Sequence, residues 1–413
     1  MQTHPPLAGA AKPQIPALTG LRFFLALWVV VFHQSAADGT IMGERIPFHL
    51  PALVCLIRTG YLAVGVFFAL SGFVLAYNYS LQAAWPFRRM IDFAVARFAR
   101  IYPAYAVGLI LMAPIVLFNV AGLPEKGWFK QTAEAGLNWT LLQAWIPTHA
   151  LSWNMPGWSR SAEAFFYLCF PLAGVALWRA SRKPNRILPL LLCFWMLALA
   201  SPVVAIVMRI PGFSDVPATA DNLHGDPFWT SLFKFNPLFH FPEFCFGILL
   251  VRFYQLIQSG NSALKGRGHL LYIPGLCLEM ILISNAGSIA FPLFHNGLLL
   301  PLHGMVMLGF ALGGGQLVFF LSSRVLHLLG NASYTMYILH WPVFEWMNWL
   351  SLRFYGTPPN GFAKFGLYVG ILIALSILVH RFIEEPANRL IKRSWHKIRS
   401  RRFEPSTINA AAA

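Results

Sequence analysis

Charged residues are scarce in this chain of 413 residues. They make up 11% of the sequence, and hydrophobic residues make up 57%, whereas an ordinary soluble domain carries roughly 25% charged residues. The mean hydropathy is +0.58. This composition excludes an ordinary soluble globular protein, and we expect an integral membrane protein.

The chain also lacks any stretch that is long and polar enough for a separate soluble domain. Its length accommodates about ten membrane spans of roughly 20 residues, joined by short loops. We predict an all-α membrane protein with a cytoplasmic tail over residues 1–14, one multi-span domain over 15–390, and a basic, partly disordered cytoplasmic tail over 391–413. The predicted spans lie near residues 18–36, 60–79, 101–121, 161–178, 188–208, 236–254, 270–287, 297–321, 333–352 and 364–383.

Acidic residues are fewer than basic ones, 15 against 31, which leaves a net charge of +16. In a membrane protein the placement of Lys and Arg matters more than their total, so we expect no nucleic-acid partner. The basic residues gather in the loops after the second, fourth, sixth, eighth and tenth spans. By the positive-inside rule, these loops and both termini face the cytoplasm. The N-terminal segment has neither a charged start nor a cleavage site, so we expect no removable signal peptide.

Cysteine and metal-ligand patterns are missing too. The five cysteines lie far apart along the chain, so we interpret them as small core residues and expect no disulfide. No two histidines stand four residues apart beside a carboxylate, so we expect no metal site. The cysteines are Cys55, Cys169, Cys193, Cys245 and Cys277.

Two ionisable residues, Arg22 and His33, nevertheless lie inside the first apolar span. An ionisable side chain at membrane depth is costly and usually functional. Their separation of 11 residues, at about 100° each, exceeds three helical turns by about 20°, so both side chains share one helix face about 16 Å apart. We predict a polar path along this face, with a cation at one end and a proton acceptor at the other.

Two further arginines, Arg97 and Arg100, stand at the predicted cytoplasmic end of the third span. Because they are three residues apart, their guanidinium groups share one side of the helix, which suits phosphate recognition. Arg88 and Arg89 precede them and are candidates to assist. The alternative is that these arginines only obey the topology rule and extend to the membrane interface.

Small and acidic residues supply more candidates. Ser71 and Gly72 lie inside the second span, where they either let a ligand approach or allow tight helix packing. Ser159 and Glu163 open the fourth span; Ser159 suits a helix cap, whereas Glu163 stands against an apolar run. If the first helix runs outward, Glu163 lies near His33, where a carboxylate orients the ring and raises its basicity.

The order and spacing of these motifs resemble a known family, the type-3 membrane acyltransferases, which move acyl groups onto sugars of cell-envelope polysaccharides, lipids and small glycosides. The resemblance covers nearly the whole chain. One departure is Ala164, where members commonly carry a polar residue. Many members also carry a fused hydrolase-like domain, which we do not expect in this chain. The matching segments are Arg22–His33 (Arg-x10-His), Phe67–Phe73 (Phe-Phe-x-Leu-Ser-Gly-Phe), Arg97–Arg100 (Arg-x-x-Arg), Trp158–Tyr167 (Trp-Ser-x-x-x-Glu-x-x-Phe-Tyr), Leu329–Pro342 and Ile383–Pro386.

The resemblance implies an O-acyltransferase of the bacterial cytoplasmic membrane. It implies that an acyl group, most simply acetyl, passes from cytoplasmic acyl-CoA to a hydroxyl of a cell-envelope or exported saccharide or glycolipid. Arg22, Arg97 and Arg100 are then expected to bind the donor, with help from Arg88 and Arg89. We expect acyl-CoA as a co-substrate, no tightly bound cofactor, and membrane lipids as neighbours; a homo-oligomer stays open.

His33 is the residue that the resemblance and the physical argument both favour for catalysis, with Glu163 beside it. A sugar hydroxyl is a poor nucleophile, and the ordinary pKa of histidine lies nearest to neutral pH, so His33 is expected to act as general base. The alternative is a covalent relay in which His33 itself carries the acyl group. The residues do not separate these mechanisms.

Further polar and aromatic residues are candidates for the wall of a substrate cavity. His240 and Glu243 stand three residues apart on one face of the sixth span, where they either line the cavity or pair with each other. His340 either lines it or makes a structural hydrogen bond. Trp158 is either an interface anchor or a stacking surface for a sugar ring. Tyr167 and Ser159 complete this set.

A multi-span transporter or flippase for a glycan or lipid-linked substrate is the competing class, because such proteins also bury charged residues. Paired halves with interrupted helices at corresponding positions are expected of a transporter. No such repeat is visible in the sequence. The identity of the acceptor stays open.

Overall fold

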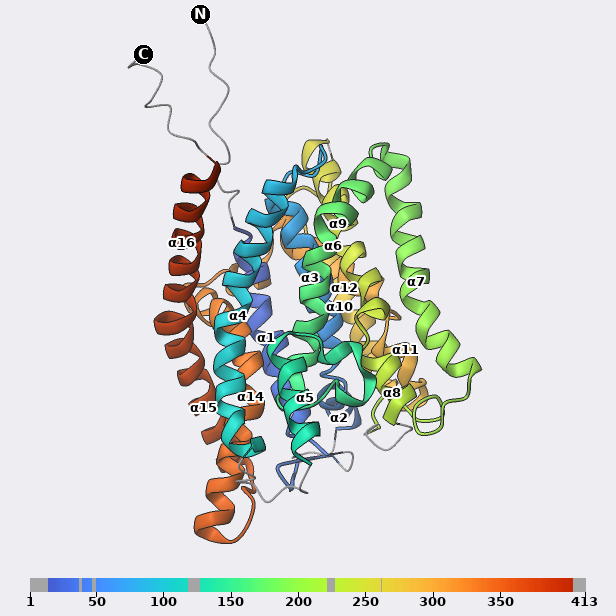
Figure 1. The fold of residues 1–413 in the computed structure, drawn as a ribbon. Helices are drawn as coiled ribbons and strands as arrows, with labels where there is room; N and C mark the ends of the chain where they lie inside the picture. The colour runs from blue at the N-terminus through green and yellow to red at the C-terminus, as the bar shows by residue number, and fades with distance from the viewer. Residues whose placement is uncertain are drawn as a thin grey trace, which may run out of the picture.

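Helices make up almost all of the regular structure in the computed structural model of this chain (Figure 1). The structure describes residues 14–36, 39–46, 50–117, 127–220, 227–260 and 262–403. Within these ranges the one sheet is an antiparallel pair of short strands, β1 (Thr40–Ile41) and β2 (Glu44–Arg45). The α-helices are α1 (Pro16–His33), α2 (Pro51–Arg58), α3 (Leu62–Asn78), α4 (Phe87–Leu117), α5 (Trp128–Trp139), α6 (Trp158–Ala180), α7 (Ile187–Val207), α8 (Pro227–Phe235), α9 (Pro237–Ser259), α10 (His269–Ser284), α11 (Phe291–His295), α12 (Leu300–Leu312), α13 (Gln316–Leu321), α14 (Arg324–Tyr355), α15 (Phe362–Val379) and α16 (Glu385–Phe403).

Short helical turns connect several of the longer helices. A π-helical turn, η7 (His380–Glu384), joins α15 to α16 without a break in the chain direction. Such π-turns are rare and are often found at functional sites. The remaining turns are 3-10 helices: η2 (Gln143–Trp145), η3 (Pro147–His149), η4 (Met155–Gly157), η5 (Pro184–Arg186) and η6 (Ala286–Ser288).

A helix lies at each of the ten ranges that the sequence predicts as spans. Among the described residues, six helical segments are long and apolar enough to cross a membrane, and α2 with α3, bent by 53°, make a seventh if they form one span. The prediction of an all-α membrane protein is confirmed at this level. The count of ten spans and the cytoplasmic side of the termini stay predictions. Residues 1–13 and 404–413 of the two predicted tails lie outside the described ranges.

Helices α3 and α9 pack with their backbones in contact because glycines stand where they meet. A Cβ atom on Gly72 would lie 2.0 Å from the carbonyl oxygen of Phe244, and one on Gly247 would lie 1.9 Å from that of Ala69. No side chain fits at either distance, so only glycine allows this approach. Of the two interpretations of Gly72, tight helix packing is the one that the structure supports.

Helices α1 and α14 also pack with their backbones in contact at a glycine. A Cβ atom on Gly330 would lie 2.0 Å from the carbonyl oxygen of Thr19. This contact near the start of both helices sets their spacing, so that polar residues further along α1 face polar residues of α14. The contact between His33 of α1 and His340 of α14 is a result of this packing.

The long basic helix α16 lies beside α4 at one edge of the bundle, and α7 forms the opposite edge (Figure 1). Asp92 of α4 holds the two helices together: the indole nitrogen of Trp395 donates to one carboxylate oxygen at 2.8 Å, and Arg399 donates to the other at 2.9 Å. Residues 391–403 of the predicted C-terminal tail are thus helical and continue α16.

All five cysteines are free thiols, but their positions differ from the expected core placement. Cys245 is buried, whereas Cys193 of α7 and Cys277 of α10 are exposed. The core interpretation is therefore wrong for these two. Their helices are predominantly apolar, and in a bilayer the exposed side of such a helix meets lipid, so composition does not distinguish a core position from a lipid-facing one.

Candidate active site

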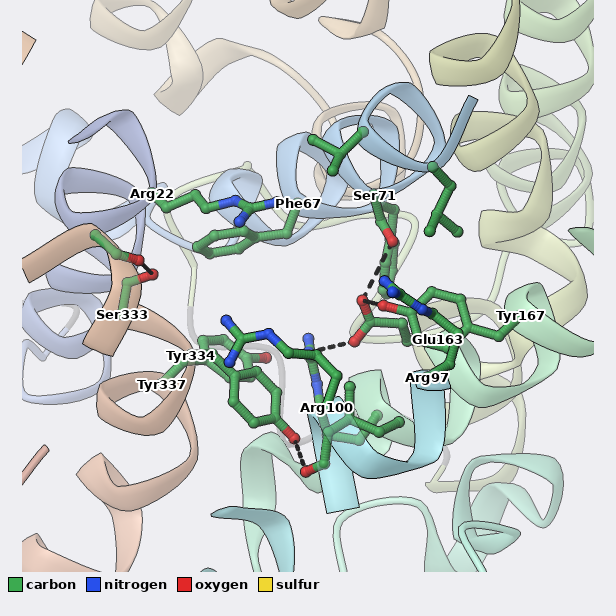
Figure 2. A pocket seen from close by; sticks show the side chains of 16 residues that line it. Arg22, Phe67, Ser71, Arg97, Arg100, Glu163, Tyr167, Ser333, Tyr334 and Tyr337 are labelled. Atoms are coloured by element: carbon green, nitrogen blue, oxygen red, sulfur yellow. Dashed lines mark hydrogen bonds and ion pairs between the residues drawn. The ribbon is translucent and has the colours of Figure 1, made fainter. Parts of the chain in front are cut away.

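Four arginines converge on one cavity of about 180 Å³, which we call the arginine cavity (Figure 2). They come from three helices that are far apart in the sequence: Arg22 from α1, Arg97 and Arg100 from α4, and Arg160 from α6. Four guanidinium groups around so small a space create a strongly positive environment. The cavity is also lined by Phe67, Phe68, Ser71, Val74, Leu75, Ile101, Glu163, Tyr167, Gly330, Ser333, Tyr334 and Tyr337.

Glu163 is the carboxylate among the residues that line this cavity, and its oxygens accept hydrogen bonds from several donors. Arg160, one turn earlier on α6, donates to one oxygen, and the hydroxyl of Tyr167, one turn later, donates to the other. Ser71 of α3 also donates to that second oxygen at 3.2 Å. A carboxylate that is held from both sides and paired with an arginine is an anchor for its neighbours.

This geometry corrects the expected contact between Glu163 and His33. Glu163 faces the arginine cavity, whereas His33, at the end of α1 opposite to Arg22, makes a polar contact with α14. The physical reason is local: Arg160 stands three residues before Glu163 on the same helix and satisfies the carboxylate directly. A role for Glu163 as the group that orients His33 has no support in the structure.

Arg100 is positioned by an ion pair with Glu384, the last residue of the π-helical turn η7. Glu384 is fully buried. It also accepts a hydrogen bond from the hydroxyl of Thr335 at 2.6 Å and contacts Nδ1 of His380 at 3.0 Å. The π-turn directs the Glu384 carboxylate toward α4, and this carboxylate holds Arg100 in place at the cavity.

Arg97 is held less completely. One terminal nitrogen donates to the hydroxyl of Tyr79 at 3.2 Å. Its Nε is buried and has no hydrogen-bond partner within the described part of the chain. A buried donor without a partner costs about 1–3 kcal/mol, so a ligand that accepts a hydrogen bond here is expected to bind favourably.

Arg88 and Arg89 do not reach the arginine cavity, although both were expected to assist in donor binding. Arg88 is exposed near the start of α4. Arg89 lies over the ring of Trp85, 4.2 Å from its centroid, and donates to the carbonyl oxygen of Ser80 at 3.1 Å. Neither residue lines the arginine cavity, so the expectation that Arg88 and Arg89 lie beside Arg97 and Arg100 at the donor site is wrong.

A second cavity of about 170 Å³ surrounds His33, and we call it the His33 cavity. Aromatic rings such as Trp158 and Trp341 line it, together with two buried cations, Arg58 and Lys234. Its wall is thus a mixture of flat apolar surfaces and a few strongly polar groups. This combination is typical of a site for a small polar molecule with apolar faces.

Tyr337 lines both cavities and therefore stands at the boundary between them. Its hydroxyl makes a 2.9 Å hydrogen bond with the hydroxyl of Ser159. The guanidinium of Arg160 lies over its ring, 5.2 Å from the centroid. Two chambers with different chemistry, one cationic and one aromatic with a histidine, thus share one wall.

His33 contacts a second histidine, His340 of α14. Nδ1 of His33 lies 3.0 Å from Nε2 of His340, and Nδ1 of His340 lies 2.6 Å from the backbone carbonyl oxygen of Tyr337. His340 is fully buried and lines neither cavity. Of the two interpretations of His340, a hydrogen bond is what the structure shows.

The other predicted cavity residues separate into three groups. Ser71 and Tyr167 line the arginine cavity, and Trp158 lines the His33 cavity. His240 and Glu243 line neither, since both are buried and their side chains contact each other at 3.2 Å. Nε2 of His240 also lies 2.7 Å from the carbonyl oxygen of Lys234. Their pairing is structural, as the alternative interpretation held.

Sequence reasoning missed several residues that the fold brings to these cavities. Arg160 lies inside the motif that supplied Glu163, and its spacing of three residues from a glutamate was a usable signal. Glu384 was recognised only as part of a matching segment, without a role. Lys234 and His295 reach the His33 cavity from short helices, and no pattern in the sequence pointed to them. Across the described ranges, no three His, Cys, Asp or Glu side chains gather closely enough to hold a metal ion.

Comparison with known proteins gives a consistent result. Residues 15–381 match a family model described as "Acyltransferase domain". The chain is 29% identical to the acyltransferase MdmB of Streptomyces mycarofaciens, over 92% of this chain and 93% of that protein. It is 23% identical to the O-acetyltransferase OatA of Staphylococcus aureus, over 91% of this chain and 57% of that protein. No solved structure gives a significant match.

A shorter similarity is found with protein 2 in the picA locus of Rhizobium radiobacter. It is 48% identical over 108 residues, which cover 26% of this chain and 49% of that protein. This match is closer in identity but limited in extent. The two longer matches, by contrast, cover more than nine tenths of this chain.

Proposed function

This chain belongs to the acyltransferase family whose model it matches, and we propose from this premise which donor and acceptor it uses. We propose that it takes an acetyl group from acetyl-CoA on the cytoplasmic side of a bacterial cytoplasmic membrane and transfers it to a hydroxyl of a cell-envelope or exported saccharide. The relative from Staphylococcus aureus is named an O-acetyltransferase. That name supports acetyl as the group and oxygen as the receiving atom.

The charge balance of the arginine cavity is the observation that carries this proposal. Arg100 and Arg160 are each paired with a carboxylate. Arg22 and Arg97 have no carboxylate partner among the described residues. Neighbouring cations inside a membrane protein are costly unless an anion joins them. The phosphates of CoA are such anions, and guanidinium groups bind phosphate through two parallel hydrogen bonds.

The long pantetheine arm of CoA lets its two ends occupy different chambers. With the phosphates among the arginines, the arm extends past Tyr337, which lines both cavities, and the thioester comes to His33. Arg22 and His33 are about 16 Å apart along α1 by helical geometry. A compact donor such as acetyl phosphate does not cover that separation, so the two-chamber arrangement favours a thioester of CoA.

His33 is proposed to act as the general base for the acceptor hydroxyl. The hydroxyl oxygen attacks the thioester carbonyl carbon while His33 removes its proton, and the bond from that carbon to sulfur breaks. The proton then passes from His33 to the leaving sulfur, which departs as the thiol of CoA. The ester and the free thiol are the products, and His33 returns to its neutral form.

The wall of the His33 cavity supports a saccharide as the acceptor. Trp158 and Trp341 offer flat rings for the apolar faces of a sugar, and the cationic side chains of Arg58 and Lys234 lie in the same wall. Aromatic faces alone would suit a lipid chain as well. The combination with polar groups in one small chamber favours a sugar over a lipid chain.

Comparison of the glycans of cells with and without this protein tests the proposal. Mass spectrometry is expected to show saccharides that are heavier by one acetyl group only when the protein is present, and fragmentation identifies the sugar. Cells with an inactive variant, His33→Ala, are the matched control and should resemble cells that lack the protein. Identical glycan masses with altered export would contradict the proposal and favour transport.

A further inference from the structure

The contact between His33 and His340 has a definite direction once the protons are assigned. Nδ1 of His33 and Nε2 of His340 are 3.0 Å apart. The ring planes are inclined by only 18° and the ring centroids are 4.9 Å apart, so the two ring planes are nearly parallel. One of these nitrogens has to carry the proton and the other has to accept it, since two lone pairs repel each other.

The far side of His340 decides which nitrogen carries the proton. Nδ1 of His340 lies 2.6 Å from the carbonyl oxygen of Tyr337, and a carbonyl oxygen only accepts hydrogen bonds. Nδ1 of His340 is therefore protonated. In a neutral imidazole the other nitrogen, Nε2, then has a lone pair and accepts from His33. Nδ1 of His33 is consequently the donor.

His33 is thereby fixed as the tautomer with its proton on Nδ1 and its lone pair on Nε2. His340 belongs to α14 and is fully buried, whereas His33 lines the His33 cavity. The nitrogen that is left for the cavity is the one that can take a proton. The opposite tautomer would place two lone pairs against each other across the 3.0 Å contact, so the packing of α1 on α14 disfavours it.

We propose that His340 is a positioning residue that selects the reactive tautomer of His33, and that the backbone carbonyl of Tyr337 selects the tautomer of His340. The inference deepens the proposed function and rests on it for its catalytic meaning. The order of hydrogen bonds runs from His33 to His340 to the carbonyl oxygen of Tyr337.

In this histidine pair the group that accepts the hydrogen bond from Nδ1 of His33 is a neutral imidazole, whereas many hydrolytic sites have a carboxylate in that place. Among the described residues, no carboxylate contacts either ring. When Nε2 of His33 takes the proton of the acceptor hydroxyl, the positive charge is stabilised by the hydrogen bond from Nδ1 to His340. Transfer of the proton from Nε2 to the sulfur of CoA restores the starting state, so no proton has to leave through His340. The other charged or titratable groups that line the cavity are Arg58, Tyr61, Lys234, His295 and Tyr337.

Two variants of His340 test the proposal in full-length protein in lipid nanodiscs, with thiol release from acetyl-CoA as the assay and water as the acceptor of the acetyl group. His340→Leu removes the group that accepts the hydrogen bond from His33, and we expect kcat to fall about 10- to 100-fold. This loss is smaller than the roughly 10²–10⁴-fold contribution of a positioned base, because His33 itself is still present. KM for acetyl-CoA should not change. His340→Gln places an amide oxygen near the position of Nε2 and should keep most of the rate. Thermal unfolding of both variants is the control for structural damage.

A methyl group separates tautomer selection from a merely structural role. Histidine methylated at Nδ1 has its lone pair on Nε2 whatever its neighbour is. Installed at position 33 in the His340→Ala background, which leaves space for the methyl group, it should restore the rate that His340→Ala loses. Equal losses in His340→Leu and His340→Gln, or no restoration by the methylated residue, overturn the inference.

Failure of the proposed function is distinguishable from failure of this inference. If wild-type protein releases no thiol from acetyl-CoA, the proposed donor is wrong. Nitrogen NMR of histidine-labelled protein then still reads the tautomer, with His33→Ala to assign the signal. The inference is supported if His33 in wild type has a protonated Nδ1 and an unprotonated Nε2, and if this tautomer is no longer the one observed in His340→Leu. The opposite tautomer in wild type refutes the inference.

Discussion

Replacement of His33 with alanine is expected to slow acetyl transfer by about 10²- to 10⁴-fold, which is the usual contribution of a positioned general base. The reason is that His33 lines the His33 cavity and has its other ring nitrogen engaged by His340. The affinity for acetyl-CoA should change little, because the phosphates are proposed to bind in the other cavity. Steady-state thiol release in nanodiscs gives kcat, and equilibrium binding of labelled CoA gives the affinity.

A matched control for this variant is His396→Ala. His396 is exposed on α16 and lines neither cavity, so its loss should leave both kcat and affinity unchanged. Retention of the wild-type rate by His33→Ala would exclude His33 as the base. A large loss of CoA affinity in the same variant would instead indicate that the donor phosphates lie near His33, contrary to the two-chamber arrangement.

Replacement of Arg97 with alanine is expected to raise KM for acetyl-CoA about 10- to 100-fold, because a hydrogen bond to a charged group contributes about 1.5–3 kcal/mol. Arg97 is the better choice than Arg100 for this test. Arg100 is paired with buried Glu384, and removal of one partner of a buried ion pair costs about 3–5 kcal/mol of stability. Arg97 has no such partner among the described residues, so its variant reports on the ligand.

Two further variants sharpen the test at Arg97. Arg97→Lys keeps the charge but loses the planar fork, so KM is expected to lie between those of wild type and Arg97→Ala. Arg179→Ala removes an exposed arginine near the end of α6, outside both cavities, and should leave KM unchanged. An equal rise of KM in Arg179→Ala would mean that overall positive charge, and not the arginine cavity, attracts the donor.

The sequence predicted those features that depend on helical periodicity. The spacing of Arg97 and Arg100 placed them on one side of a helix, and both line the same cavity in the structure. Arg22 joins them there. A separate signal, the long apolar runs, located a helix at every predicted span, because apolar runs of membrane helices are long and have clear ends.

Contacts between distant helices could not be predicted in this way. His340 lies 307 residues from His33, and only the packing of α1 on α14 brings the two rings together. Glu384 meets Arg100 because a π-helical turn changes the direction of side chains at the junction of α15 and α16. No single-sequence pattern specifies such a turn. The expected partner of Glu163 was wrong because the nearer Arg160 was overlooked.

The central claim is that one donor molecule occupies both cavities, with its phosphates among the arginines and its thioester at His33. A cryo-electron microscopy structure of the protein with a non-hydrolysable analogue of acetyl-CoA tests this most directly. We predict phosphate density in contact with Arg22 and Arg97, and the acetyl group beyond Tyr337 within hydrogen-bonding distance of Nε2 of His33. An analogue bound outside the arginine cavity, or one whose acetyl group stays on the arginine side of Tyr337, would contradict the account.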